Sequence, residues 1–285
     1  YHLHDPELIP IGLMLKKTGK KVVFDSHEDI PNQILSKHYI HQLLKTPLSK
    51  GFRLFEKLTC SRFDAIITAT PFIRDKFLKI NSVTIDINNF PRIEELENLD
   101  KSRKVFNQVC YIGGLSDVRG IAEMVKAINI TSTKSKLNLA GNFADPAFKK
   151  YIKSLPGWEQ VNFLGFIGRD QVKKTLSTSI AGLVVLHPTQ SYLDSLPVKM
   201  FEYMLAGLPV IASDFPYWRS IIEDVNCGLC IDPLNPEAIA NAIDYFVNNP
   251  EIADTMGSNG KQAVIDKYNW SVEETKLLKL YAQLI

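Results

Sequence analysis

The sequence is poor in cysteine and has no long apolar run, and both shortages narrow the class of protein. Three of its four cysteines lie in apolar or element-terminal contexts, as expected of reduced intracellular thiols. Cys227 and Cys230 have C-x-x-C spacing, which is open to zinc or redox chemistry, but no second Cys/His pair accompanies them. We interpret this segment as a turn into a buried strand. No run reaches the roughly 18 apolar residues that span a bilayer, and no signal peptide is visible.

The sequence also lacks a large net charge of either sign and several known catalytic motifs. The net charge is only +2, which is too small to indicate a nucleic-acid partner. The segment Gly113–Gly120 lacks G-x-G-x-x-G spacing, which disfavours NAD or FAD. No G-x-S-x-G motif and no spacing of a hydrolase triad occurs. The sequence therefore predicts neither a nucleic-acid-binding protein nor a dinucleotide enzyme nor a serine hydrolase.

What the chain does contain is a repeated alternation of strand and helix patterns. Its 285 residues, 45% of them hydrophobic, suffice for about two domains with substantial cores. The alternation runs to Ile87, the polar and charged segment from Asn88 to Lys104 suits a linker, and the alternation then restarts. We predict an α/β protein with two doubly wound parallel sheets. Because Tyr1–Asp5 has the pattern of a strand end and a loop, we expect the first domain to be truncated at its N-terminus.

One stretch, Ser191–Pro216, has the pattern of an anion-binding loop and helix. A polar loop leads into Pro197, and proline is favoured at the start of a helix. Free backbone amides at a helix start favour a bound anion; here they are those of Leu196, Val198 and Lys199. Lys199 adds a cation, and Glu202 behind it is suited to accept hydrogen bonds from a ribose diol. An ordinary loop with a solvated Lys–Glu pair is the alternative.

This stretch resembles a motif of a known enzyme family. Asp194 and Glu202 are eight positions apart, and other motif residues follow in register: Pro197, Lys199, Phe201–Met204 and Gly207–Val210. The pattern is similar to the E-x7-E region of the retaining glycosyltransferases of family 4, of group 1 type, with Asp194 where that family usually has glutamate. The resemblance implies the GT-B fold, with two Rossmann-like domains. We place a partial acceptor-side domain at 1–98, a nucleotide-sugar-binding domain at 99–268, and a helix that crosses back to the first domain at 269–285.

The resemblance also implies roles for individual residues. Asp194 is expected to contact the donor sugar, Glu202 the ribose, and His27 the sugar or an acceptor hydroxyl, and these are the candidate catalytic residues. Two glycines after a strand let the backbone approach a ligand closely, and Arg119 takes the place of the family's lysine on the donor diphosphate. The donor-binding candidates are Gly113, Gly114, Arg119, Gly141, Phe166, Ile167, Ser195, Leu196, Pro197, Val198, Lys199 and Glu202. Plain turns at the glycines and a structural His27 are the alternatives.

The implied reaction is retaining transfer of a sugar from a UDP- or GDP-sugar to a hydroxyl of a growing glycan or lipid-linked glycan. Synthesis of a cell-surface polysaccharide or lipopolysaccharide is the expected context. No tightly bound cofactor is expected, and no metal, because the Asp-x-Asp pair that metal-dependent GT-A transferases need is absent. Two alternatives stay open: a sugar-nucleotide epimerase of GT-B fold, and a non-catalytic nucleotide-binding fragment.

The expected location is the cytoplasm. The basic face from Lys45 to Arg62, interleaved with Phe52 and Phe55, has two interpretations. It is either a solvated helix face or a peripheral contact with the inner face of the cell membrane.

Overall fold

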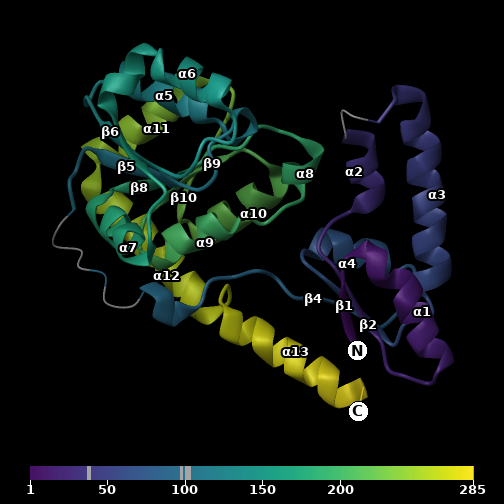
Figure 1. Ribbon diagram of the computed structural model, residues 1–285. Helices are drawn as coiled ribbons and strands as arrows, with labels where there is room; N and C mark the ends of the chain where they lie inside the picture. The colour runs from purple at the N-terminus through teal and green to yellow at the C-terminus, as the bar shows by residue number, and fades with distance from the viewer. Residues whose placement is uncertain (37–39, 97–98, 100–103, 285) are drawn as a thin grey trace. The chain divides into compact units, whose positions relative to one another are not determined.

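The chain forms two compact α/β units. The computed structural model describes residues 1–36, 40–96, 99 and 104–284. The first unit comprises Tyr1–Asn89, Asp194–Leu196 and Trp270–Ile285, and the second comprises Phe90–Leu193 and Pro197–Asn269 (Figure 1). Each unit is built on one parallel sheet. The structure therefore confirms the predicted α/β class with two parallel-sheet, Rossmann-like units.

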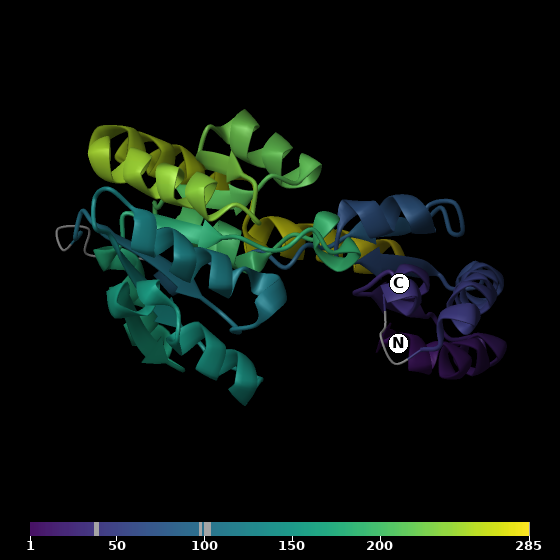
Figure 2. The same ribbon diagram turned by 90° about the horizontal axis from the view of Figure 1, so that it is seen from above.

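The first unit has a four-stranded sheet in the order β1-β2-β3-β4. Its strands are β1 (His2–His4), β2 (Val23–Ser26), β3 (Ala65–Thr68) and β4 (Thr84–Asp86). Its helices are α1 (Ile9–Lys17), α2 (Ile30–Ser36), α3 (Gln42–Cys60), α4 (Pro71–Phe77) and α13 (Trp270–Leu284). The helix α3 stands upright in Figure 1 and is seen along its axis in Figure 2.

Successive strand residues point to opposite sides of this sheet, and both sides are buried. Phe24 and Ile66 belong to a core that also contains residues of α1 and α4. Val23 and Ile67 point the other way and pack with Leu280 of α13. The last helix of the chain thus closes the second face of the first sheet.

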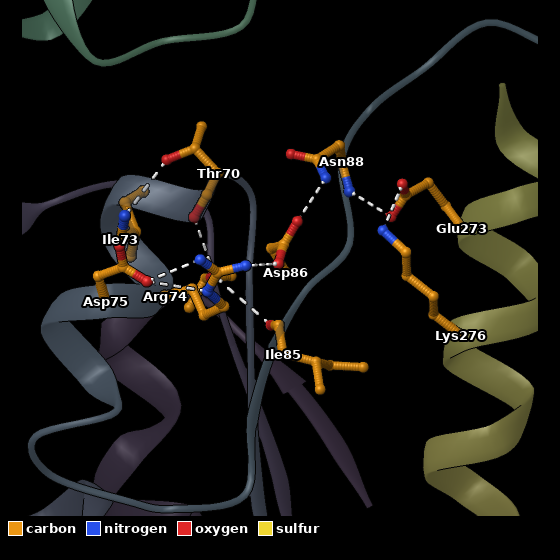
Figure 3. A network of polar contacts seen from close by, with 10 residues as sticks. Thr70, Ile73, Arg74, Asp75, Ile85, Asp86, Asn88, Glu273 and Lys276 are labelled. Carbon is orange, nitrogen blue, oxygen red and sulfur yellow. Dashed lines mark hydrogen bonds and ion pairs between the residues drawn. The ribbon is translucent and has the colours of Figure 1, made fainter. Parts of the chain in front are cut away.

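Polar contacts fix α13 to the end of β4 (Figure 3). The carboxylate of Glu273 accepts a hydrogen bond from the backbone N–H of Asn88 at 3.0 Å and one from Lys276 at 2.8 Å. The amide of Asn88 donates to Asp86, which also accepts from Arg74, both at 2.7 Å. Burial alone raises the pKa of Asp86, but these hydrogen bonds outweigh it and hold the pKa below its usual range. The network therefore stabilises the unit above the ordinary carboxyl pKa and less so as the pH falls through the lowered one.

The second unit has a six-stranded sheet in the order β10-β9-β8-β5-β6-β7. Its strands are β5 (Gln108–Ile112), β6 (Lys136–Ala140), β7 (Val161–Gly165), β8 (Ala181–Val184), β9 (Val210–Ser213) and β10 (Gly228–Ile231). The chain builds outward from β5 to β7, returns to β8 beside β5, and then builds in the other direction. The carboxyl ends of β5 and β8 thus form the switch point at which ligands of such sheets bind.

Eight α-helices among the described residues belong to this unit. They are α5 (Ile121–Ile130), α6 (Pro146–Lys153), α7 (Arg169–Thr178), α8 (Gln190–Leu193), α9 (Val198–Leu205), α10 (Pro216–Val225), α11 (Pro236–Asn248) and α12 (Pro250–Asp266). Strand residues such as Leu183 pack with α5 and α11 on one face, while Gly182 meets Tyr203 of α9 on the other. No helix in the described ranges is long and apolar enough to cross a bilayer.

Two features of the first unit differ from the sequence prediction. The basic face noted from Lys45 to Arg62 belongs to α3, which begins earlier, at Gln42, because His41 caps it and accepts from the N–H of Leu43 at 3.4 Å. The helix then continues through Pro47 on its exposed side. The short α2 was not predicted at all.

Removal of the Glu273 carboxylate should destabilise the protein. Glu273 is 1% exposed, and its loss leaves the buried amide of Asn88 without an acceptor. We expect Glu273→Ala to lower the free energy of unfolding by about 1–3 kcal/mol in urea denaturation. The exposed neighbour Glu274 supplies the control, since Glu274→Ala should change it by less than about 0.5 kcal/mol. Equal stabilities for the two variants would contradict this account of α13.

Candidate functional site

One face of α9 is turned toward the end of β5. Lys199 and Tyr203 are four positions apart and therefore lie on the same side of the helix. The hydroxyl of Tyr203 accepts a hydrogen bond from the N–H of Ile112 at 2.9 Å. The ring of Tyr203 packs on Gly182, where a Cβ would lie 2.2 Å from it. These contacts hold the first turn of α9 beside the switch point of the sheet.

Lys199 reaches into the turn that follows β5. Its Nζ donates to the hydroxyl of Tyr111 at 2.8 Å and lies 4.0 Å from the centre of that ring. The same hydroxyl donates to the carbonyl of Gly114 at 2.9 Å. Gly113 has φ +151°, and a Cβ there would lie 2.8 Å from the Lys199 ammonium. The structure thus brings together Gly113, Gly114 and Lys199, which the sequence analysis had selected from separate segments.

Arg119 completes a positively charged cluster. It ends a short 3-10 turn, Asp117–Arg119, and its guanidinium lies 3.8 Å from the position of a Cβ on Gly114. Burial first, and then the positive charge of Arg119, lower the pKa of Lys199 to about 7 against an opposing effect of Glu202. Burial likewise raises the pKa of Tyr111 to about 12. Lys199 forms no ion pair with any residue that the structure describes.

Glycines at the ends of β5 and β6 pack directly on one another. Gly141 has φ +141°, and a Cβ there would lie 1.8 Å from the carbonyl oxygen of Gly113. The N–H of Gly113 donates to Ala140 at 3.0 Å, and that of Gly141 donates to Gly165 at 2.7 Å. No other residue type fits at Gly141 without displacing the backbone of the Gly113 turn. Gly141 therefore supports the site from behind.

Glu202 forms its ion pair with Arg169 of α7, not with Lys199. It accepts a hydrogen bond from Arg169 at 3.0 Å, and Arg169 also binds Glu95. The alternative of a solvated Lys199–Glu202 pair is therefore wrong, because the ammonium group lies on Tyr111 instead. Sequence reasoning missed both Arg169 and Tyr111. The sequence feature that could have indicated Arg169 is its position directly after the Gly165–Gly168 turn.

The remaining candidates are distributed over both units. In the second unit, Phe166 and Ile167 follow β7, and Phe166 is 81% exposed. Pro197 caps the start of α9, and Val198 is its first residue. In the first unit lie His27, Asp194, Ser195 and Leu196. His27 lines a cavity of about 780 Å³ together with Asp25, Glu28 and Phe52.

The arrangement at α9 suits a polyanion. Lys199 and Arg119 provide two cations, and the glycine turn leaves room for a ligand to approach the backbone. A helix start adjoins them, with its unpaired N–H groups and positive dipole end. Glu202 offers a carboxylate acceptor one turn further along. This set of groups is what a nucleoside diphosphate requires.

Comparison with known proteins assigns the chain to a family. The family model of the glycosyl transferases group 1 matches residues 93–263. Since this is more than half of the chain, the protein belongs to that family. The resemblance inferred from Asp194–Val210 is thereby confirmed at the level of group 1.

Individual relatives are distant. A glycosyltransferase of Methanocaldococcus jannaschii, itself described as uncharacterized, is 26% identical over 215 residues, which are 71% of this chain and 52% of the relative. Alpha-D-kanosaminyltransferase of Streptomyces kanamyceticus is 23% identical over 62% of this chain and 45% of its own. The chain thus spans about half the length of these curated relatives. HepE of Anabaena, solved with UDP, superimposes with a TM-score of 0.77 at 14% identity, over 99% of this chain and 79% of its own. That likeness shows the GT-B fold.

Replacement of Lys199 by an apolar residue should stabilise the protein. Its pKa of about 7 in the folded state lies below the 10.5 of a free lysine, so the unfolded state binds more protons between these values and stability rises with pH there. The cost of burying the charge is therefore largest below pH 7. We expect Lys199→Met to raise the melting temperature more at pH 6 than at pH 9. At pH 6 the gain in the free energy of unfolding should be on the order of a few kcal/mol.

The exposed Lys174 on α7 is the control for this effect. Lys174→Met should leave the melting temperature nearly unchanged at both pH values. If Lys199→Met were no more stable than the wild type at pH 6, the burial argument would be wrong.

Proposed function

We propose that the protein transfers a sugar from a UDP- or GDP-sugar to a hydroxyl of a growing glycan, with retention of the anomeric configuration. The observation that supports this most directly is the cluster of Lys199 and Arg119 against the Gly113–Gly114 turn. Membership of the group 1 glycosyl transferases supports the reaction class. The named transfer of kanosamine by one relative, and the UDP and UDP-glucose seen with HepE, are consistent with a nucleotide-sugar donor.

In this proposal the diphosphate of the donor binds at the start of α9. Lys199 and Arg119 neutralise its charge, and the backbone N–H groups from Leu196 to Lys199 donate to its oxygens. Negative charge grows on the diphosphate as the bond to the sugar breaks. Donors that already point at this position stabilise the transition state more than the ground state, which lowers the barrier. These groups stabilise the negative charge on the diphosphate that a metal ion stabilises in other transferases. In this proposal the reaction therefore requires no metal and no tightly bound cofactor.

The nucleoside lies behind the diphosphate. Glu202 accepts hydrogen bonds from the ribose hydroxyls, and Arg169 holds its carboxylate in place. Phe166 and Ile167, in the exposed turn after β7, contact the base largely through the backbone. Backbone contacts of this kind accommodate either uracil or guanine, and both donors are therefore retained in the proposal.

The sugar and the acceptor are assigned on the resemblance. Asp194 and Ser195 contact the donor sugar, and His27 contacts the sugar or the acceptor hydroxyl. The cavity beside His27 has both polar and apolar lining residues, as a glycan or a lipid-linked glycan needs. We place the reaction in the synthesis of a cell-surface polysaccharide or lipopolysaccharide, in the cytoplasm.

Because the diphosphate and the ribose contact different residues in this proposal, substitutions of those residues should lower the affinity for different ligands. Calorimetric titration with UDP and with inorganic pyrophosphate distinguishes them. Lys199→Gln and Arg119→Gln should each weaken both ligands by about tenfold to a hundredfold, which corresponds to one charged hydrogen bond. Glu202→Gln should weaken UDP and leave pyrophosphate unchanged. GDP in place of UDP reports the preferred base.

The control for these titrations is Lys174→Gln, on the exposed side of α7, which should bind both ligands like the wild type. Unaltered UDP and pyrophosphate affinities in Lys199→Gln would remove the basis of the proposal. Turnover then separates the reaction classes. A transferase needs an acceptor to consume the nucleotide sugar, an epimerase releases an epimer without one, and a binding protein does neither.

An anionic membrane surface is a further partner in this proposal, and α3 is the element that contacts it. Leucines of α3 form an exposed apolar stripe, with Leu43, Leu44, Leu48, Leu54 and Leu58 each 49–80% exposed. Lys50, Arg53 and Lys57 lie beside this stripe and are also exposed. An exposed apolar stripe edged by cations suits the interface of an anionic bilayer. Phe52 and Phe55, the aromatics singled out in the sequence, instead face the cavity and the core of the unit.

Binding of vesicles should depend on this leucine stripe. We expect co-sedimentation with vesicles that contain phosphatidylglycerol, little with pure phosphatidylcholine, and release at high salt because the cations are screened. The double variant Leu44→Ser/Leu48→Ser should lose most of the binding. Leu234→Ser, which alters a similarly exposed leucine of the second unit, should not. Sedimentation of wild type and double variant in equal amounts would exclude α3 as the contact.

A further inference from the structure

The pairing of β1 with β2 gathers three histidines and an aspartate on one face of the first sheet. His4 lies opposite Asp25, and His2 lies opposite Val23. Because side chains two positions apart share a face, His2 and His4 point to the same side as Val23 and Asp25. This is the side that α13 covers. His27 follows Asp25 by two positions, at the end of β2.

The nitrogens of these histidines converge on one carboxylate oxygen. Oδ2 of Asp25 is 3.4 Å from Nε2 of His2, 3.3 Å from Nδ1 of His4 and 3.6 Å from Nε2 of His27. Nδ1 of His4 and Nε2 of His27 are 3.2 Å apart. The ligand atoms of His2, His4 and Asp25 all lie within 4.8 Å of one another. Four potential ligand atoms therefore surround a very small volume.

Four of these distances match edges of a metal-centred tetrahedron, which has six edges in all. A zinc ion bound at 2.0–2.1 Å to nitrogen and oxygen ligands separates neighbouring ligand atoms by about 3.3 Å, from the geometry of the tetrahedron. The separations from Asp25 to the three histidines, and from His4 to His27, lie between 3.2 and 3.6 Å, and the His2 and His4 nitrogens lie within 4.8 Å of each other. Imidazole and carboxylate are also the ligand types that zinc and its first-row neighbours accept.

The surroundings of His2 provide an independent observation. Its Nε2 is buried and has no hydrogen-bond partner among the described residues, although it faces Asp25. Its other nitrogen, Nδ1, lies 2.5 Å from the hydroxyl of Tyr281 on α13. Histidines that bind metals characteristically use the second nitrogen in this way, which fixes the tautomer and the ring orientation. The free Nε2 is the atom that points into the cluster.

We propose that His2, His4 and Asp25 bind a divalent transition-metal ion of the zinc type, with His27 as the fourth ligand. The ion joins the carboxyl ends of β1 and β2 and neutralises the Asp25 carboxylate. A network of hydrogen bonds among the same side chains, with a proton in place of the ion, is the competing explanation. The ion lies in the first unit and takes no part in binding the diphosphate of the donor.

Titration with cobalt distinguishes the two explanations. The whole protein, prepared without a histidine tag and stripped with EDTA, is titrated with Co2+, whose visible bands report four-coordinate geometry. We expect one Co2+ per chain with such bands, displacement by Zn2+, and a higher melting temperature with Zn2+. Absence of the bands, or a spectrum of the hydrated ion at every concentration, would overturn the proposal.

Variants then locate the site. His4→Ala and Asp25→Asn should abolish the cobalt bands, and His27→Ala should weaken binding and alter the spectrum. Tyr281→Phe keeps the packing of α13 and should weaken binding about 10- to 100-fold, as loss of an outer-shell partner does. His41→Ala, outside the cluster, is the control. Circular dichroism identifies any variant that fails to fold, and folded cluster variants that bind Co2+ like the wild type would reject these ligands.

Discussion

The placement of the Lys199 ammonium inside the protein is the constraint that shapes the candidate site of the second unit. A buried cation beside Arg119, with no ion-pair partner among the described residues, is unfavourable, and the Lys199 pKa of about 7 reflects that cost. The contacts around the Lys199 ammonium hold it in this buried position. Tyr111 gives the ammonium an oxygen and a ring face, and Gly113 leaves it room. In the proposed complex a bound polyanion would offset this unfavourable charge, so part of the stability that the free protein loses would return as binding affinity.

Much of this site could be predicted because its signals are local. Glycines after a strand and a proline at a helix start follow from backbone geometry, and a cation in the first turn is notable because the helix dipole disfavours it there. They identified Gly113, Gly114 and Lys199 without knowledge of the fold. Tyr111 could not be predicted, because it lies within an apolar strand and looks like an ordinary core residue until the lysine from α9 reaches it. Arg169 resembles a solvated cation at a helix start, and only the packing of α7 beside α9 gives it Glu202 as a partner.

The first unit shows where sequence patterns are insufficient. The amphipathic pattern of α3 predicts a helix, but it does not say which of two apolar stripes faces inward. The aromatic stripe turned out to face the cavity and the core, and the leucine stripe is exposed. The contacts of His2 and His4 with Asp25 could not be predicted from the sequence either. The register of parallel strands is set by the crossover between them and by burial, neither of which is visible in the short segment around Tyr1–Asp5.

The histidine cluster and the cavity beside it share His27, and this imposes a choice on that residue. An imidazole whose Nε2 is bound to a cation cannot accept a proton or a hydrogen bond through that atom. A contact of His27 with a sugar or an acceptor hydroxyl through Nε2 therefore belongs to the form without the ion. With the ion bound, only Nδ1 of His27 remains available to the cavity, and Glu28 is the nearest other ionisable lining residue in sequence. The two proposals for the first unit are thus linked through one nitrogen atom, and whether the cluster holds a metal ion decides what His27 is able to do.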